Sequence, residues 1–214
     1  MINPHKENRE QTKYWLDWAI ELQALAQNGL TFSKDPFDIE RYKRIRDLSA
    51  EIISKQSDLS FDKVKGLFCS EEGYQTPKIE TRAAIFEDDK ILMVKEKDEL
   101  WSLPGGWIDV NQTIKTNTIK EVKEEAGLDV KAVRIISLLD RNKYNSPIYA
   151  YNVCKVFVLC ERIGGSFQPN IETSESHYFA LDELPPLAID KNTKEQIALC
   201  FKAYKEGNWT VYFD

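Results

Sequence analysis

The residues from Val153 to Leu159 form a run that is apolar on both faces of an extended chain, and only Lys155 interrupts it. Side chains alternate between the two faces of a strand, so this run predicts a strand that is buried on both sides. Such a strand lies in the middle of a sheet covered by helices, and we therefore expect an α/β or α+β sandwich. Hydrophobic residues make up 42% and charged residues 30% of the 214-residue chain, values that exclude a disordered or collagen-like protein.

The first part of the chain shows the residue spacing of helices. Apolar residues on one helix face recur at Trp15, Trp18, Ala19, Leu22, Leu25 and Ala26. Asn28 and Gly29 predict the end of this helix, because glycine readily adopts the left-handed conformation found at helix C-termini. A second helix is expected from Asp35-Pro36, with an aspartate cap and a proline in the first turn, and a third from Ser60.

A turn-rich stretch from Ser70 to Pro77 separates these helices from a part with strand patterns. Two runs, Thr81–Phe86 and Lys90–Lys95, flank three acidic residues and predict a hairpin. A last helix is expected over Lys191–Lys205. The sequence therefore changes from an all-helical part to a mixed α and β part at this stretch.

We predict a helical N-terminal domain over residues 1–70, a linker over 71–77 and a larger domain over 78–214. A small helical domain buries a low fraction of its surface, and its first helix carries Trp15 and Trp18 on one face. That face must meet the larger domain or another copy of the chain, and we expect a homodimer to which the helical domain contributes. The domain can be a surface that binds a partner or shapes the substrate site, or an appendage that packs on the larger domain.

The charge of the chain limits its partners. Its net charge is −6 and its pI is near 5.2, so it has no general attraction for phosphate backbones and we expect no nucleic-acid partner. The chain has four cysteines without a CxxC spacing and only two histidines. We therefore expect no structural zinc site of the Cys/His type. The first seven residues lack an apolar run, so we expect no signal peptide. No segment approaches the roughly 18 apolar residues of a membrane helix, and we expect a cytoplasmic protein.

Three glutamates gather on one face of another predicted helix. Glu121, Glu124 and Glu125 fall within about a 100° arc. The opposite face is apolar and carries Ile119, Val122 and Ala126. Like charges this close destabilise a helix unless a cation neutralises them, and Mg²⁺ prefers oxygen ligands. The alternative is a solvated acidic face, but Gly105 and Gly106 upstream favour a metal site, because glycines let the backbone approach a ligand.

This part of the chain resembles the signature of the Nudix hydrolases. The signature reads glycine, five residues, Glu, seven residues, Arg-Glu, an aliphatic residue, any residue, Glu-Glu, any residue, glycine and an aliphatic residue. It is matched with every spacing intact by Gly106, Glu121, Val122, Glu124, Glu125, Gly127 and Leu128. Gln112 replaces the first Glu, Lys120 the Arg and Asn111 a common glycine. The resemblance implies a Nudix-type α/β/α sandwich with a mixed sheet, preceded here by a small all-α unit.

A narrower resemblance concerns one Nudix subgroup, which acts on nucleoside diphosphates linked to another moiety and includes a CDP-choline pyrophosphatase. The segments Leu25–Leu30, Phe37–Tyr42 and Pro104–Val110 are similar to that subgroup. The first Glu is missing there too, so Gln112 does not by itself imply a dead enzyme. The resemblance implies hydrolysis of a CDP-choline-like substrate to a nucleoside monophosphate and a phosphorylated product, with ADP-ribose as an alternative. A non-catalytic nucleotide sensor is an alternative of another class, although such sensors usually lose the helix glutamates.

The resemblance also implies roles for particular residues. Hydrolysis of a diphosphate calls for Mg²⁺ or Mn²⁺, because metal ions neutralise its oxygens and activate water. Glu121 and Glu125 are expected as direct metal ligands, and Glu124 and the Gly105 carbonyl as further ones. The three glutamates also form the expected catalytic set. The general base is left open among four carboxylates, those of Glu121, Glu124, Glu172 and Glu175.

Four residues outside the acidic helix are expected at the substrate. Arg82 lies on an otherwise apolar strand face, where a positive charge needs a partner such as a substrate phosphate. Trp107 can stack on a base or belong to the core. Arg141 lies between two strand patterns, in a loop over the site or in a solvated turn. Asp109 belongs to the segment that resembles the subgroup.

Overall fold

The computed structural model describes the backbone of residues 4–214 and the side chains of residues 14–214. Met1, Ile2 and Asn3, part of the segment that we expect not to be a signal peptide, lie outside the described residues. The chain divides into two compact units, Met1–Pro77 and Lys78–Asp214, named here the helical unit and the sheet unit. Among the described residues, no helix is long and apolar enough to cross a membrane.

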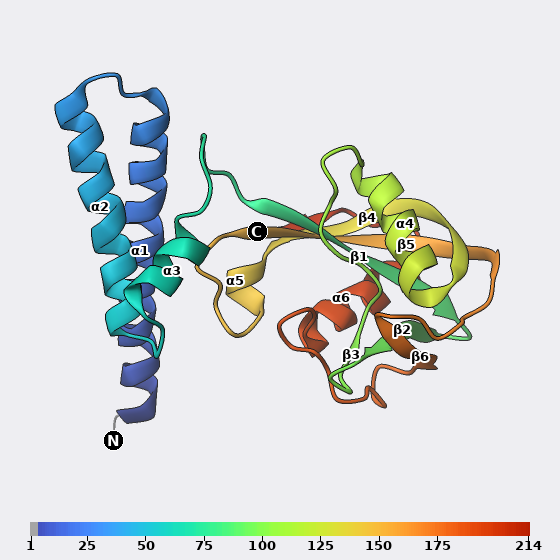
Figure 1. The fold of residues 1–214 in the computed structure, drawn as a ribbon. Helices are drawn as coiled ribbons and strands as arrows, with labels where there is room; N and C mark the ends of the chain where they lie inside the picture. Colours follow the sequence, from blue (N-terminus) through green and yellow to red (C-terminus); the bar gives the residue numbers. More distant parts are fainter. Residues whose placement is uncertain (1–3) are drawn as a thin grey trace. The chain divides into compact units, whose positions relative to one another are not determined.

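The helical unit contains three helices (Figure 1): α1 over Pro4–Phe32, α2 over Pro36–Lys55 and α3 over Phe61–Phe68. α1 and α2 lie side by side, and α3 packs against α2. The expected cap of α2 is present, and α3 is capped as well. The Asp35 carboxylate accepts hydrogen bonds from the backbone N–H groups of Phe37 (2.9 Å) and Asp38 (3.0 Å), and the Ser60 side chain caps α3. These polar caps satisfy helix N–H groups that would otherwise lack a partner.

The end of α1 differs from the prediction. The helix does not stop at Gly29 but continues to Phe32. A β-carbon at Gly29 would lie 2.4 Å from the ring of Tyr42 in α2. This glycine therefore lets the two helices approach each other instead of ending α1, and the packing offsets its low helix propensity.

The sheet unit contains seven strands: β1 over Lys78–Glu87, β2 over Lys90–Glu96, β3 over Trp101–Ser102, β4 over Leu128–Asp140, β5 over Val153–Gly165, β6 over Thr173–Phe179 and β7 over Tyr212–Phe213. Its helices are α4 over Ile114–Ala126, α5 over Arg141–Tyr144 and α6 over Lys194–Lys205. The strand order is β3-β2-β1-β5-β4-β7, and β6 pairs with β2. Two pairs, β1 with β5 and β4 with β7, are parallel and the others antiparallel. The expected α+β fold with a mixed sheet is confirmed.

β5 lies at the centre of the sheet, as its two apolar faces predict. It pairs with β1 on one side and with β4 on the other. The expected hairpin is also present: β1 and β2 are antiparallel, and Asp88 and Asp89 between them both have positive φ angles. Two such residues in a row form the tight turn that suits the twist of paired strands.

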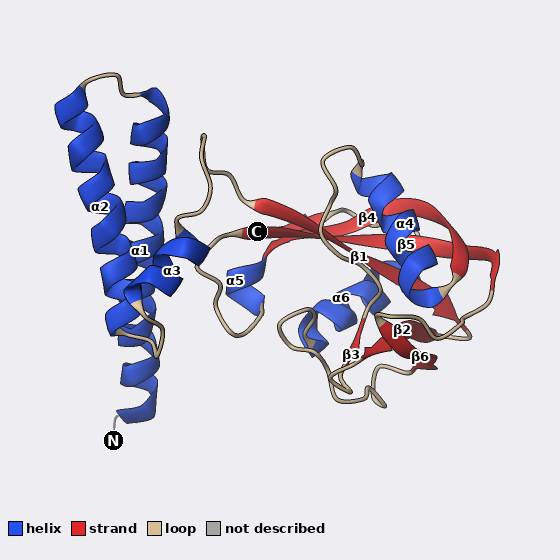
Figure 2. Ribbon diagram, viewed as in Figure 1, coloured by secondary structure: helices blue, strands red, loops and turns tan. Residues whose placement is uncertain are grey.

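Helices cover both faces of the sheet (Figure 2). On one face, Ile197, Cys200 and Phe201 of α6 pack with Phe157 of β5. On the other face, Val122 and Ala126 of α4 pack with further core residues of β1, β2, β4 and β5. α4 is therefore held against the sheet by its apolar side, which leaves the side with the glutamates for other contacts.

Candidate active site

A short extended segment, Pro104–Trp107, runs beside β1 and forms one wall of the candidate site. The backbone N–H of Thr81 donates a hydrogen bond to the carbonyl oxygen of Gly106 (2.9 Å). Gly105 has a φ of +148°, and a β-carbon there would lie 2.0 Å from the carbonyl oxygen of Thr81. Only glycine fits at this position, because any side chain would collide with the backbone of β1.

α4 is fixed at both ends and along its length. Thr113 and Thr116 form a reciprocal capping box at the start of the helix, and Gly127 ends it in the left-handed conformation. The side chain of Asn117, which is fully buried, donates a hydrogen bond to the hydroxyl of Thr81 (3.0 Å). These contacts tie the helix to β1 and set the positions of its glutamates.

The carboxylate of Glu125 is buried against the glycine segment. It accepts a hydrogen bond from the backbone N–H of Gly105 at 2.8 Å. Burial raises the pKa of Glu125 to about 7, although the charge of Arg82 and the hydrogen bond from Gly105 act to lower it. A carboxyl group in this state is readily ionised by a nearby cation, because the cation compensates for lost hydration.

The ammonium group of Lys120 lies among three carboxylates. Its Nζ is 2.8 Å from Oε2 of Glu124 and 3.2 Å from Oε1 of Glu121, and it is 3.5 Å from Oδ2 of Asp109. Hydrogen bonding to Glu124 raises the pKa of Lys120, while burial alone would lower it. Burial also raises the pKa of Glu121. This group of oxygen atoms therefore already accommodates one positive charge, that of the lysine side chain.

The glutamates share a helix face but do not converge on one point. In the part of the chain that the structure describes, no group of three or more His, Cys, Asp or Glu side chains is placed closely enough to hold a metal ion. Glu124 pairs with Lys120 at the surface, whereas Glu125 faces Gly105. A metal ion bound here would have to take over carboxylate oxygens that now interact with an ammonium and a backbone N–H.

The glycine segment and the glutamates of α4 line one cavity of about 350 Å³. Its lining residues are Glu80, Arg82, Gly105, Gly106, Trp107, Lys120, Glu121, Glu124, Glu125, Tyr149, Glu172, Asp190 and Lys191. The structure thus brings together six of the residues expected from the sequence: Arg82, Gly105, Trp107, Glu121, Glu124 and Glu125. Asp109 and Arg141 are not among the lining residues. Of the downstream acids, Glu172 lines the cavity, whereas Glu175 pairs with Lys95 at 3.1 Å.

Arg82 has a protein partner that the sequence did not reveal. Its Nε lies 2.5 Å from Oε1 of Glu80, and its Nη1 donates a hydrogen bond to the carbonyl oxygen of Leu103 at 2.9 Å. Lys155, which is fully buried, lies 3.5 Å from the same Glu80 oxygen and also donates to the carbonyl of Lys191. Burial opposes ionisation of Glu80, but the two cations outweigh it and lower its pKa. The carboxylate of Glu80 therefore pairs with two buried basic side chains, those of Arg82 and Lys155.

Several residues of the site were missed at the level of sequence. Glu80 shares the strand parity of Arg82, a signal that could have linked them. Tyr149, Asp190 and Lys191 lie in loops, and no local pattern points to them. Arg141 is fully buried, and its guanidinium lies against the ring of Tyr149, so any effect of Arg141 on the cavity is indirect.

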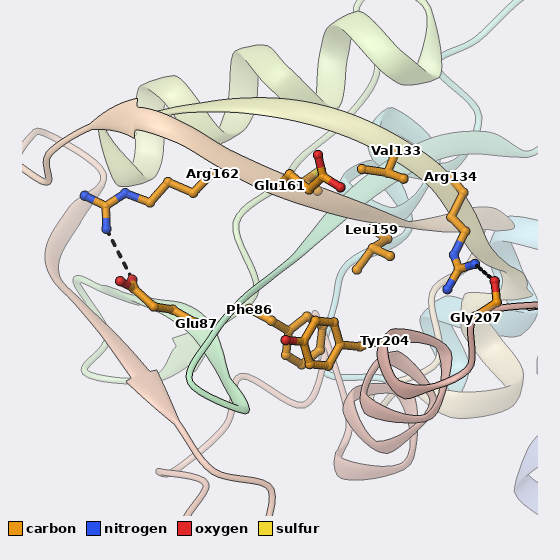
Figure 3. Close-up of a pocket in the computed structure, with 10 residues that line it drawn as sticks. Phe86, Glu87, Val133, Arg134, Leu159, Glu161, Arg162, Tyr204 and Gly207 are labelled. Atoms are coloured by element: carbon orange, nitrogen blue, oxygen red, sulfur yellow. Dashed lines mark hydrogen bonds and ion pairs between the residues drawn. The ribbon is translucent and has the colours of Figure 1, made fainter.

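A second, larger cavity of about 610 Å³ lies between α6 and the strands β1, β4 and β5 (Figure 3). Its floor includes the stacked rings of Phe86 and Tyr204. The charged groups around it interact with each other or with the backbone: Arg162 with Glu87, and Arg134 with the carbonyl oxygen of Gly207. The smaller cavity gathers the three glutamates of α4 beside the glycine segment, and it is therefore the better candidate for chemistry.

Comparison with known families agrees with the geometry. Residues 13–68 match the family model described as "UDP-X-like, N-terminal oligomerisation domain", and residues 77–200 match the model of the NUDIX domain. The second match alone covers more than half of the chain. The chain belongs to the Nudix hydrolase family, and the resemblance seen in its signature is confirmed.

Two relatives match almost the whole length of the chain, and a third matches about two thirds of it. The "Putative ADP-ribose pyrophosphatase YjhB" of Bacillus subtilis (strain 168) is 40% identical over 205 residues, which cover 95% of this chain and 98% of that protein. A crystal structure of a UDP-X diphosphatase has a TM-score of 0.62 and 35% identity, and the match covers 95% of this chain and 99% of that one. An ADP-ribose pyrophosphatase structure from Streptococcus suis 89-1591 has a TM-score of 0.61 and 57% identity, covering 65% of this chain and 100% of that one. These relatives make the protein a member of a pyrophosphatase branch of the family.

Proposed function

We propose that this protein uses Mg²⁺ or Mn²⁺ to hydrolyse the pyrophosphate bond of a nucleoside diphosphate linked to another moiety. The products are a nucleoside monophosphate and a phosphorylated second product. The observation that carries the proposal is the make-up of one cavity, in which three carboxylates of α4 share the lining with the buried Arg82. Carboxylates suit a hard divalent cation, and a guanidinium suits a phosphate.

The chemistry of the donor set fits a divalent cation. The carboxylates of Glu121 and Glu124 already bind the ammonium of Lys120, and the raised pKa of Glu125 reflects a buried carboxyl group that a cation would help to ionise. In the proposal, Glu121 and Glu125 are direct ligands, and Glu124 and the Gly105 carbonyl complete the set. A bound ion would neutralise phosphate oxygens and lower the pKa of a water molecule.

The other residues of the cavity orient the substrate. We assign the phosphate contact to Arg82, whose guanidinium is held by Glu80 and by the Leu103 carbonyl. Trp107, which is partly exposed at the cavity, offers an apolar surface to the rest of the substrate. Asp109 acts through Lys120, which it faces at 3.5 Å. Among the candidates for the general base that lie outside α4, Glu172 is preferred because it lines the cavity.

The substrate class is proposed at the level that the relatives share. The relatives named above are called an ADP-ribose pyrophosphatase or a UDP-X diphosphatase, and the sequence resemblance adds a CDP-choline-like compound. All three are nucleoside diphosphates joined to a further group. We also propose that the enzyme is a homodimer, which the match to an oligomerisation domain supports, and that it is cytoplasmic.

A substrate screen tests the proposal. The full chain is incubated with ADP-ribose, CDP-choline, UDP-glucose and a nucleoside triphosphate, each with Mg²⁺, with Mn²⁺ or with EDTA, and the products are separated by chromatography. We expect a nucleoside monophosphate from at least one linked compound, and its loss in EDTA. Hydrolysis that persists in EDTA contradicts the proposed requirement for a divalent metal ion. Binding of a compound without turnover of any of them indicates a nucleotide sensor instead of an enzyme.

A further inference from the structure

Three aromatic rings form a continuous group at the candidate cavity. Trp107 and Tyr149 line the cavity. Tyr151 joins them, since its ring centroid lies 6.2 Å from that of Trp107 and 5.5 Å from that of Tyr149. Trp107 and Tyr151 remain 43% and 36% exposed. A surface of this kind can take either a flat neutral ring or a cation such as a quaternary ammonium group.

Tyr149 is held in place by the turn that precedes it. Its backbone N–H donates a hydrogen bond to Oδ1 of Asn142 (3.0 Å), and its carbonyl oxygen accepts one from Nδ2 of the same side chain (2.9 Å). The carboxylate of Asp140 in turn accepts a hydrogen bond from the backbone N–H of Asn142 (2.8 Å). A ring with its backbone fixed on both sides loses little conformational entropy when a ligand stacks on it.

Arg141 occupies one face of the Tyr149 ring. Its guanidinium carbon lies 3.2 Å from the ring centroid, and the side chain is fully buried. Its Nη1 donates a hydrogen bond to the carbonyl of Pro147 at 2.6 Å. Its Nε and Nη2 are buried and have no hydrogen-bond partner in the described part of the chain. The guanidinium of Arg141 therefore interacts with the Tyr149 ring and not with a carboxylate.

This arrangement discriminates between the two possible occupants. A cation on the face of the Tyr149 ring opposite Arg141 would compete with Arg141 for the same ring electrons and would be repelled by its charge. A neutral flat ring meets neither penalty, because stacking requires only a polarizable face.

We propose that Tyr149 is the ring on which the nucleobase of the substrate stacks, and that Arg141 is a positioning residue that holds this ring and keeps cationic groups away from it. The inference rests on the proposed function and deepens it. It assigns the aromatic group to the nucleoside end of the substrate, so the moiety linked to the diphosphate lies elsewhere. The enzyme then recognises the base without regard to the charge of the second moiety.

Product binding tests the assignment without catalysis. Dissociation constants of AMP, CMP and UMP, and of phosphocholine and ribose 5-phosphate, are measured by calorimetry on the full chain and its variants. Tyr149→Ala should raise the dissociation constant of each nucleoside monophosphate by about tenfold or more, the usual loss for one stacking aromatic. The dissociation constants of phosphocholine and ribose 5-phosphate should not change. Tyr149→Phe should bind like the parent protein. Tyr204→Ala, which removes a tyrosine from the other cavity, is the matched control and should also bind like the parent.

Arg141→Met separates positioning from mere support of the fold. It should weaken the binding of the nucleoside monophosphates and strengthen the binding of phosphocholine, because the repelling charge is gone. If Arg141 only supported the fold, the binding of both kinds of ligand would weaken. A loss at Tyr149→Ala that falls on phosphocholine and spares the nucleotides overturns the proposal in favour of a site for the cationic moiety. Absence of nucleoside monophosphate binding by the parent protein overturns it as well. Lack of hydrolysis with intact nucleotide binding refutes only the proposed function.

Discussion

The backbone N–H of Gly105 donates a hydrogen bond to the carboxylate of Glu125 across 2.8 Å. This bond joins the glycine segment that precedes α4 to the acidic face of α4, and the two residues lie twenty positions apart in the chain. It holds a buried carboxyl group whose pKa burial raises to about 7. The glycine segment and the acidic helix therefore form one site, and changes in either part should affect the same activity.

The glutamates are expected to dominate turnover. Glu121→Gln and Glu125→Gln should each lower kcat by at least about 10²-fold, because each removes a carboxylate that would hold the metal ion, and with it positive charge that stabilises the anionic transition state. Circular dichroism should show an unchanged fold. Glu161→Gln, which alters an exposed glutamate paired with Lys131 on β4, is the control and should keep the parent rate. Near-normal rates for both variants in Mg²⁺ would place the metal site elsewhere.

Gly105→Ala is expected to destabilise the sheet unit. The new β-carbon would lie 2.0 Å from the carbonyl oxygen of Thr81, at a φ of +148°, so β1 or the glycine segment must shift. We expect a loss of about 3 kcal/mol or more in the free energy of unfolding, measured in urea. Gly207→Ala, where an added β-carbon meets nothing within 4 Å, should change it by less than about 0.5 kcal/mol.

Gln112→Glu restores the residue that the Nudix signature has at this position. Gln112 is not among the residues that line the cavity, and its backbone N–H forms a turn with the carbonyl of Asp109. The α4 carboxylates remain in place, so we expect activity to change by less than about tenfold. A gain of several hundredfold in kcat/KM would instead identify the natural sequence as an impaired enzyme.

Lys155 should make stability depend on pH above neutrality. Burial lowers the pKa of Lys155 to about 7, although Glu80 acts to raise it. Between pH 7 and about 10 the unfolded chain then binds more protons at this residue than the folded chain, so the free energy of unfolding rises with pH. In Lys155→Met this rise should shrink by about 2 kcal/mol or more. Lys131→Met, at a mostly exposed lysine, should retain the rise, and parallel profiles for Lys155→Met and the parent would contradict the shift.

The sequence alone predicts what depends on local patterns. The central position of β5 follows from its own two apolar faces, and the cap of α2 follows from Asp35-Pro36. The cluster of Glu80 with Lys155 was not predicted, because it depends on the parallel register in which Glu80 of β1 lies opposite Lys155 of β5. That register pairs strands far apart in the chain, and no local spacing encodes it.

The glycines also show that a local pattern does not reveal contacts with distant parts of the chain. The glycine pair before the acidic helix predicts a close approach of the backbone to a ligand, whereas the close neighbour of Gly105 in the structure is the carbonyl oxygen of Thr81 in β1. Gly29 after Asn28 predicts a helix end, but α1 continues to Phe32, and the ring of Tyr42 in α2 requires the small size of Gly29. A glycine in isolation gives the same signal for both roles, and only the position of the second helix distinguishes them.

The helical unit presents an apolar surface to its surroundings. Tyr14, Trp18 and Leu25 of α1 are 57%, 60% and 56% exposed, and Phe37 at the start of α2 is 66% exposed. The buried face of α1 is formed by smaller or polar residues, namely Ala19, Gln23, Ala26 and Gln27. The ring centroids of Tyr14 and Trp18 lie 6.3 Å apart, and exposed large apolar side chains that lie close together mark interaction surfaces.

We predict that this surface forms the interface of a homodimer. Changing Trp18 and Leu25 together to glutamate places two charges where apolar side chains would meet their copies in a two-fold interface, so the variant should become monomeric. Light scattering on the full chain measures the mass of the parent and of the variant. Val110→Glu, at a fully exposed apolar residue of the sheet unit, is the matched control and should remain dimeric. A monomeric parent protein contradicts the prediction, and so does a double variant that dimerises as before, because the contact would then lie elsewhere.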